Sequence, residues 1–189
     1  DNVVLENFWQ RELPIYPRGQ IELQNHGNTL YFRNLYIREI ASDEANKMLE
    51  ASDAKQYESI FNGRDFSGWK GDLENYEVVD GAFVCKAGKG GTVFKDKQYS
   101  DFVSRLEFKL PPGGNNGLAL RYPGTGQPHI GGLELQVLDS EDAQYAALDP
   151  RQYHGSVYGL VAAHRGYLRP TGEWNFQQVT MVGSKIKVE

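Results

Sequence analysis

The stretch FVSRLEFKLPPGG, residues 102–114, decides the fold class of this chain. Its side chains alternate strictly, so that Ser104, Leu106 and Phe108 would lie on one face, and Arg105 and Glu107 on the other. A period of two is typical of a β-strand with one face on a core. The Pro-Pro-Gly-Gly run that follows ends the strand in a turn. The stretch therefore predicts a half-buried strand.

The flanking sequence contains further strand and turn signals. Asp80-Gly81 stands between two β-forming runs, and this pair suits a type I′ hairpin because both central residues of that turn need a positive φ. A second hairpin is predicted over Gly183-Ser184. The predicted strands are residues 76–79, 82–85, 102–110, 117–122, 132–139, 174–182 and 185–188. Regularly spaced strands with turn signals indicate an all-β sandwich or jelly roll.

Residues 42–56 (SDEANKMLEASDAKQ) predict a helix. Ser42 or Asp43 can cap its N-terminus, and acidic residues crowd the first turn, where they suit the helix dipole. Ala45, Met48 and Leu49 form a narrow apolar stripe at helical spacing. We expect a linker helix between two β segments, packed at the edge of the domain.

The two ends of the chain are predicted to belong together. Residues 20–40 are typical of the closing strands of an all-β domain, and residues 57–79 of its opening strands. Residues 185–189 stop in mid-strand, and the N-terminal segment could supply the partner that this strand lacks. We expect either one compact unit with a shifted starting point or a piece of a larger tandem protein.

Size and composition narrow the class of protein. The 189 residues suit one domain with a short appendage and can bury a sizeable core without disulfides. The net charge of -5, without a basic face, argues against nucleic acid as a partner. No run of residues approaches a membrane span, and Cys85 has no second cysteine to pair with. The 12% of aromatic residues and the 21 glycines suit a β-rich surface that binds sugars.

The strand LELQVLD, residues 133–139, carries the sharpest candidate for a site. Its leucines at 133 and 135 and Val137 would face the core, so Glu134 and Gln136 would project side by side from the opposite face. Carboxylates and amides are the usual partners of sugar hydroxyls. A polar face in contact with solvent is the simpler interpretation, and alternation alone favours it slightly.

Two nearby residues extend this candidate. If residues 117–122 pair with residues 132–139, Arg121 would lie beside Glu134 and keep its carboxylate ionised. A surface ion pair of little energetic value is an equally good interpretation. Asn116 is interpreted as a turn residue, because asparagine tolerates a left-handed backbone, whereas the role of Asn115 stays open.

The chain has four histidines, His26, His129, His154 and His164, and none stands at the spacing of a metal motif. His26 and His154 each precede a glycine near a strand end, where a loop opens onto the rim of a sheet. Imidazole can move protons near neutral pH, so both are candidates for chemistry. A histidine in a turn is more often structural, and that interpretation stays open for both.

Several of these segments resemble the bacterial 3-keto-disaccharide hydrolase family. The matching pieces are SIFNGRDFSGW (59–69), FVSRLEFKLPPGGNNG (102–117), LELQVLD (133–139), HGSVYG (154–159) and GEWN (172–175). Two further pieces, QNHG (24–27) and YFRNLYIREI (31–40), resemble the C-terminal strands of the family. The resemblance implies a concanavalin-like jelly roll with two curved sheets and a polar concave face.

The order of these pieces departs from the family pattern. The segments that resemble the C-terminal part of a family domain come before those that resemble its N-terminal part. We expect residues 1–41 to be the C-terminal strands of a family domain, 42–56 a linker helix, and 57–189 the N-terminal and central part of a family domain. A tandem arrangement and a circular permutation both account for this order. In either case residues 1–40 would complete the sheets of residues 57–189, within one chain or by strand exchange between two copies.

The resemblance also implies a reaction on sugars oxidised at C3. The ketone acidifies the C2 proton, a base removes it, the aglycone leaves with help from an acid, and water adds to the enone. Glu134 would be the base or a sugar anchor, His154 the proton donor, and Arg121 would stabilise the enolate or orient Glu134. The candidates for binding hydroxyls are Gln136, Tyr158, His26 and Asn115.

The sequence requires no cofactor, although Glu134, Asp139 and a histidine could supply ligands to a divalent metal. The resemblance implies a periplasmic or extracellular protein with a carbohydrate substrate. Two other functions stay open. A carbohydrate-binding module without catalysis uses the same polar, concave jelly roll. In a structural interaction domain, another subunit would cover the face at residues 121, 134 and 136.

Overall fold

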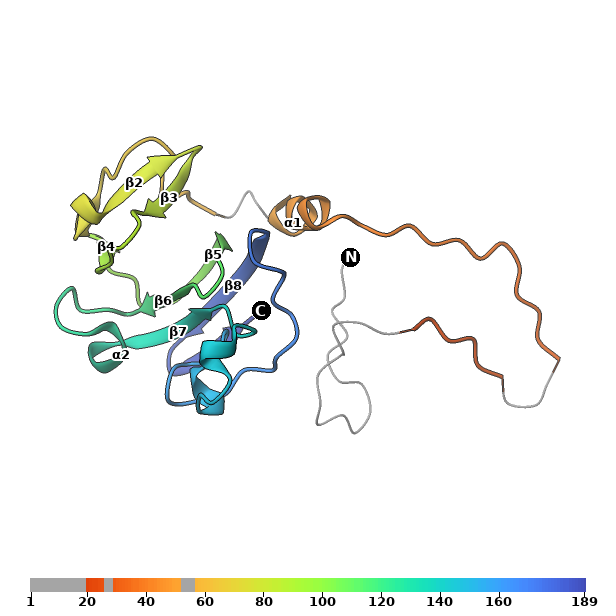
Figure 1. The fold of residues 1–189 in the computed structure, drawn as a ribbon. Helices are drawn as coiled ribbons and strands as arrows, with labels where there is room; N and C mark the ends of the chain where they lie inside the picture. Colours follow the sequence, from red (N-terminus) through yellow and green to blue (C-terminus); the bar gives the residue numbers. More distant parts are fainter. Residues whose placement is uncertain (1–19, 26–28, 52–56) are drawn as a thin grey trace.

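The computed structural model describes residues 20–25, 29–51 and 57–189 (Figure 1). Its strands are β1 (Trp69–Gly71), β2 (Tyr76–Val79), β3 (Ala82–Cys85), β4 (Val93–Lys95), β5 (Phe102–Lys109), β6 (Asn115–Leu120), β7 (Leu133–Leu138), β8 (Trp174–Val182) and β9 (Lys185–Val188). Its helices are α1 (Ser42–Ala51) and α2 (Pro128–Gly131), with 3-10 turns η2 (Leu73–Asn75), η3 (Ala143–Tyr145) and η4 (Pro150–Gln152). None of the helices in these ranges is long and apolar enough to cross a bilayer.

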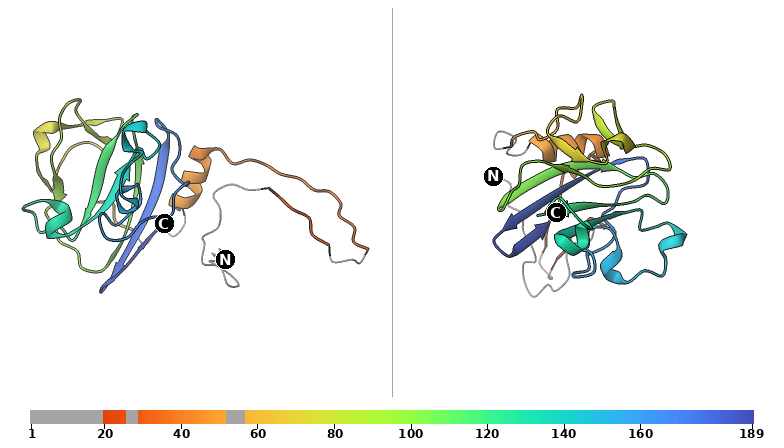
Figure 2. Two further views of the ribbon diagram at one scale, coloured as in Figure 1. Left: turned by 60° about the horizontal axis from the view of Figure 1, so that its bottom comes forward. Right: turned by 90° about the vertical axis from the view of Figure 1, so that its left-hand side faces the viewer.

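Two antiparallel sheets face each other across the core, which confirms the predicted all-β sandwich. One sheet has the strand order β5-β8-β9, and the other pairs β6 with β7. Between them Leu120, Leu135, Val157, Val179 and Met181 form one buried cluster. Each such side chain contributes about 1.5–3 kcal/mol when it leaves water. The views in Figure 2 show these strands in layers, with α1 beside β8.

The predicted hairpin turn at Asp80-Gly81 is confirmed. β2 pairs with β3, and the two turn residues have φ values of 51° and 79°. Both residues are therefore in the left-handed region that a type I′ turn requires. The second predicted hairpin, over Gly183-Ser184, joins β8 to β9.

A further segment lies along the free edge of β7. Leu135 forms an antiparallel bridge with Val157, the Tyr158 N–H donates to the Glu134 carbonyl at 2.8 Å, and the Gln136 N–H donates to the Ser156 carbonyl at 3.0 Å. β7 is therefore flanked by β6 on one side and by residues 155–158 on the other. Directly opposed residues of paired segments share a face, so Tyr158 lies on the face of Glu134.

Helix α1 is fastened to the outer face of the β5-β8-β9 sheet. Asn46, which is 3% exposed, donates from Nδ2 to Glu107 Oε1 at 2.8 Å and to the Trp174 carbonyl at 3.1 Å. The predicted apolar stripe is not used, since Met48 and Leu49 remain about half exposed. A polar side chain, and not the apolar stripe, therefore anchors the helix on the outside of the domain. Residues 52–56 of the predicted helix lie outside the described residues.

The strands predicted within residues 20–40 do not form in the described part of this segment. Residues 20–25 and 29–40 contain no strand, and the chain leads away from the sheets beyond α1 (Figure 1). A strand needs a partner for its backbone groups and its side chains. Residues 29–40 are therefore extended and do not join the described sheets of their own chain.

We expect Asn46→Ala to loosen α1 without unfolding the sandwich. The substitution leaves the Trp174 carbonyl and the Glu107 carboxylate without this donor, at a cost of about 1–3 kcal/mol. Hydrogen exchange of the amides in residues 43–51 should accelerate, while exchange in β8 stays nearly unchanged. Lys47→Ala, at an exposed position of the same helix, is the control. Equal protection of α1 in the wild type and the Asn46 variant would contradict the anchoring role.

Candidate functional site

Glu134 projects from β7 on the face away from the core. Its neighbour Leu135 is fully buried, whereas the Glu134 side chain keeps 20% of its surface exposed. Across the pairing with β6, Glu134 stands opposite Ala119, next to Gly117 on the same face. A Cβ atom on Gly117 would collide with the Glu134 carboxylate, which therefore lies over the space that this glycine leaves.

The partner of Glu134 is a histidine to which the sequence assigned no role. His129 Nδ1 lies 3.5 Å from Glu134 Oε2, and the histidine side chain is 39% exposed. His129 belongs to α2, a single turn that begins at Pro128 and ends just before β7. Proline suits the first position of a helix. The sequence Gln127-Pro128-His129 could therefore have indicated a short helical turn that places a histidine next to the following strand. The two groups form an ion pair whenever the imidazole is protonated.

Tyr158 joins this pair from the other edge of β7. Its ring lies edge-on to the His129 ring, with 5.6 Å between the centroids. Gln152 donates from Nε2 to the Tyr158 hydroxyl at 2.8 Å and accepts at Oε1 from the Asp149 N–H at 3.2 Å. Both ends of the Gln152 amide are thus engaged, and the tyrosine keeps its own proton for another acceptor. Nothing in the local sequence pattern indicated a role for Gln152.

Asp149 holds the turn that carries Gln152. Its carboxylate accepts from the Arg151 N–H at 2.9 Å and from Arg151 Nε at 2.8 Å. These hydrogen bonds from Arg151 lower the pKa of Asp149 to about 2. The carboxylate therefore stays ionised at neutral and mildly acidic pH, and the cap persists there.

Gln136 and Asn115, both predicted to bind hydroxyls, are joined on the same face. Gln136 Nε2 donates to Asn115 Oδ1 at 3.1 Å. Gln136 is only 5% exposed, whereas Asn115 is exposed. The structure therefore brings Glu134, Gln136 and Asn115 together, and Asn115 offers the amide that a ligand can reach.

His154 lies on the opposite side of this sheet. Its ring packs 5.1 Å from the ring of Phe108, on the inner face of β5, and its Nδ1 is buried without a partner in the described part of the chain. Burial lowers the pKa of His154 to about 4, against the effect of a hydrogen bond with the Gln136 backbone. Gly155, with a φ of 80°, interrupts the extended backbone, so alternation cannot be counted back to residue 154. The predicted proton donor beside Glu134 is therefore a neutral core histidine.

Arg121 does not pair with Glu134 either, although β6 and β7 pair as expected. The residue has a φ of 52°, which takes its side chain out of the strand alternation. Its guanidinium donates to the Ser100 carbonyl at 2.7 and 3.0 Å and lies 3.4 Å from Asp101. Arg121 thus ties the end of β6 to the residues just before β5.

The predicted set of metal ligands does not come together within the described ranges. Asp139 is buried and accepts a hydrogen bond from the Gly113 N–H at 2.9 Å. No three His, Cys, Asp or Glu side chains among these residues are placed to hold a metal ion. His26, the remaining histidine candidate, lies outside the described residues.

A separate surface hollow lies where the start of α1 meets the loop before β8. Its lining consists of Ile40, Ser42, Glu173 and residues 166–170. None of the residues that surround Glu134 contributes to it. The Glu134 group is therefore a feature of the sheet face and independent of this hollow.

A comparison with known families assigns the domain that carries this site. A family model described as the 3-keto-alpha-glucoside-1,2-lyase-like domain matches residues 56–189. The chain belongs to this family. The matched range includes both sheets of the lyase-like domain and the whole group around Glu134, which confirms the resemblance found in the sequence.

Relatives of the lyase-like domain are found among characterised proteins and solved structures. The 3-keto-disaccharide hydrolase of Bacteroides thetaiotaomicron is 26% identical over 166 residues, which cover 74% of this chain and 57% of that protein. The chain thus spans little more than half of that relative. A candidate glycosyl hydrolase from Parabacteroides distasonis has a TM-score of 0.63 at 25% identity, covering 74% of this chain and 70% of the other. A second structure from that organism shares the fold at a TM-score of 0.60 and 23% identity, covering 65% and 61%.

We expect acid to destabilise the lyase-like domain through His154. In the folded state this side chain stays neutral down to about pH 4, whereas in the unfolded chain it binds a proton near pH 6.5. Lowering the pH between these values favours the unfolded state by up to about 3 kcal/mol. Urea unfolding at neutral pH and near pH 4 measures this loss, which should shrink in His154→Gln and persist in the exposed control His164→Gln. The same pH dependence in all three proteins would contradict the buried, neutral state.

Proposed function

We propose that the Glu134 face cleaves 3-keto-glycosides by elimination followed by hydration. The observation that carries the proposal is the pair of a carboxylate and an imidazole, Glu134 and His129, both partly exposed on the outer face of β7 in a lyase-like domain. One group can take a proton while the other gives one, which is what an elimination needs. The relative named as a 3-keto-disaccharide hydrolase supports the substrate class.

In this reaction the Glu134 carboxylate takes the C2 proton of a sugar that carries a ketone at C3. The electrons of the C2–H bond form an enolate between C2 and C3. The enolate then restores the C3 carbonyl, forms a double bond between C1 and C2, and breaks the C1–O bond to the aglycone. Protonated His129 gives its proton to the departing oxygen. Water finally adds a hydroxyl at C1 and a proton at C2, so the net reaction is hydrolysis.

The neighbours of the pair suit the remaining tasks. The Tyr158 hydroxyl accepts from Gln152 and can donate its own proton to the enolate oxygen. Asn115, positioned by Gln136, can bind a sugar hydroxyl. His129 is partly exposed and can exchange its proton with solvent between turnovers. His154 and Arg121 take no part, because their side chains are engaged elsewhere. A periplasmic or extracellular place of action belongs to the proposal and rests on the family resemblance.

We expect Glu134→Gln to lower kcat on a chromogenic 3-keto-glucoside by about 10²- to 10⁴-fold, because the amide cannot accept the C2 proton. In heavy water the wild type should also exchange hydrogen at C2, and this variant should not. Glu77→Gln, an exposed position on β2, is the matched control and should keep its activity. The unoxidised parent glucoside should react with none of the proteins. Turnover of the keto sugar by Glu134→Gln at the wild-type rate would contradict the proposal. Binding of plain glycans without turnover would favour a carbohydrate-binding module.

We expect the two histidines to differ in their effect on the leaving group. His129→Gln should slow the release of a poor leaving group much more than that of a good one, because only a poor leaving group needs the proton. His154→Gln should leave both rates close to the wild type in protein that is folded. Measuring kcat/KM for aglycones of graded acidity separates the two residues. If the effect on poor leaving groups appeared in His154→Gln and not in His129→Gln, His154 would be the general acid and the assignment of His129 would be wrong.

We expect Gly117→Ala to disturb the site without disturbing the fold. Gly117 does not have a positive φ, so its backbone tolerates alanine, but the added Cβ must displace the Glu134 carboxylate. Activity on the 3-keto-glucoside should fall at least about tenfold, since small displacements of catalytic groups are costly. Gly90→Ala is the control, because Gly90 also lacks a positive φ and its added Cβ meets nothing. Equal activity in both variants would show that Glu134 need not lie over residue 117.

A further inference from the structure

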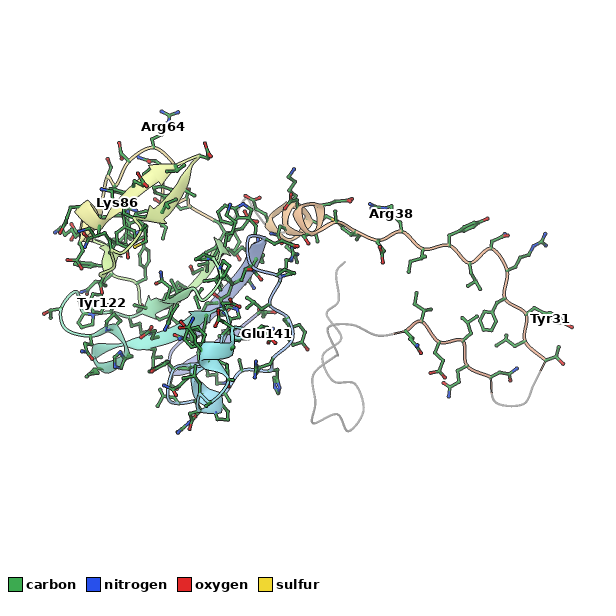
Figure 3. All side chains as sticks on the ribbon, viewed as in Figure 1. Tyr31, Arg38, Arg64, Lys86, Tyr122 and Glu141 are labelled. Carbon is green, nitrogen blue, oxygen red and sulfur yellow. The ribbon has the colours of Figure 1, made fainter. Side chains whose placement is uncertain are left out.

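Residues 29–40 form the most exposed apolar segment in the described part of the chain. Tyr31, Tyr36 and Ile37 are 87%, 90% and 74% exposed, and Leu30, Phe32, Leu35 and Ile40 are each about half exposed or more. Figure 3 shows side chains along this segment, Tyr31 among them, pointing into open space. Contiguous apolar surface of this kind on a water-soluble segment marks an interaction site.

The segment has the pattern of a strand although it is unpaired. Leu35 and Ile37 alternate with Tyr36 and Arg38, so one face is aliphatic and the other is amphipathic. Asn34 has a φ of 59°, a left-handed value that in strands is typical of a bulge. The backbone is thus extended, with one irregular residue, and presents N–H and C=O groups that no ladder among the described strands uses.

A contact with α1 directs the segment away from its own sheets. Arg38 Nη1 lies 2.9 and 2.8 Å from the two carboxylate oxygens of Glu44. Asn46, two residues further on, is buried on the outer face of the β5-β8-β9 sheet. The segment therefore leaves α1 on the side away from the sandwich, as the views in Figures 1 and 2 both show.

Among the edge strands that the structure describes, β5 is the longest. This strand has eight residues and pairs with β8 alone among the described strands. The inner row of β8 is buried, with 7%, 4%, 0% and 2% exposure at Asn175, Gln177, Val179 and Met181. The inner row of β5, which stands opposite, is partly exposed at every position. The core is therefore open along β5, and Gln177 Oε1 is buried beside it without a partner in the described residues.

We propose that residues 30–40 of one copy of this chain add as a strand to the β5 edge of a second copy. The β5 edge and the segment can supply each other with backbone hydrogen-bond partners. The segment also has an aliphatic face that could cover the open inner row of β5. Leu35 and Ile37 would cover the open inner row of β5, which includes Leu106 and Phe108. Because every copy carries both elements, a reciprocal exchange closes into a two-fold dimer. The course of the segment, which leads away from its own sandwich beyond α1, is the reason for choosing a second copy over the chain's own β5.

Light scattering over a range of protein concentrations tests the association. The full chain should change from monomer to dimer as its concentration rises, because the exchange is bimolecular. Leu35→Asp combined with Ile37→Asp should weaken the dimer at least about tenfold, whereas both positions are exposed in the monomer, so its urea stability should not change. Leu160→Asp combined with Val161→Asp is the matched control, since these residues are 62% and 61% exposed and lie outside the segment. The proposal would be overturned if the chain stayed monomeric at all concentrations. It would also be overturned if the Leu35 and Ile37 substitutions left the dimer dissociation constant unchanged.

Hydrogen exchange at low and high protein concentration tests the place of contact. The amides of residues 30–40 and of β5 should gain protection together at high concentration, and only in proteins with Leu35 and Ile37 intact. Protection of the segment without protection of β5 would overturn the choice of edge. Protection that does not depend on concentration would show that the segment pairs within its own chain, which would overturn the exchange.

Discussion

The burial of Leu135 between the two sheets is the constraint on which the Glu134 site depends. This side chain has no exposed surface, and its strand is paired on both edges, by β6 and by residues 155–158. A strand cannot turn one side chain inward without turning its neighbours outward. Leu135 in the core therefore places Glu134 and Gln136 on the outer face, and the bridge to Val157 places Tyr158 beside them. A slip of one residue in this register would bury the carboxylate and expose the leucine.

Histidines 129 and 154 show how position in the fold separates residues of the same type. His154 lies against Phe108 inside the sandwich, where burial lowers its pKa to about 4. His129 lies on the open face, within reach of a carboxylate. Only the second environment places an imidazole next to a carboxylate and in contact with solvent. The sandwich thus uses one histidine as packing and leaves the other available for chemistry.

The same sandwich is well closed on one side and open on the other. β8 is covered by α1 on its outer face and by the core on its inner face, whereas β5 has a free edge and a partly exposed inner row. The apolar residues 29–40 stand outside this arrangement, beyond the exposed contact of Arg38 with Glu44. An open sheet edge and an extended apolar segment in one chain are complementary, and this complementarity is the basis of the proposed exchange.

Local pattern in the sequence was enough to determine the all-β class, the two hairpins, the strands 102–110 and 132–139, and the face from which Glu134 and Gln136 project. These features depend on alternation and on turn residues, which act over a few positions. The sequence could not show that Arg121 turns toward Ser100, that His154 turns inward, or that His129 reaches Glu134, since each depends on a left-handed residue or a short turn between elements. It also could not show that residues 29–40, although strand-like, would form no strand with the described residues. Pairing and burial join residues far apart in the chain, and only the tertiary structure decides which of them meet.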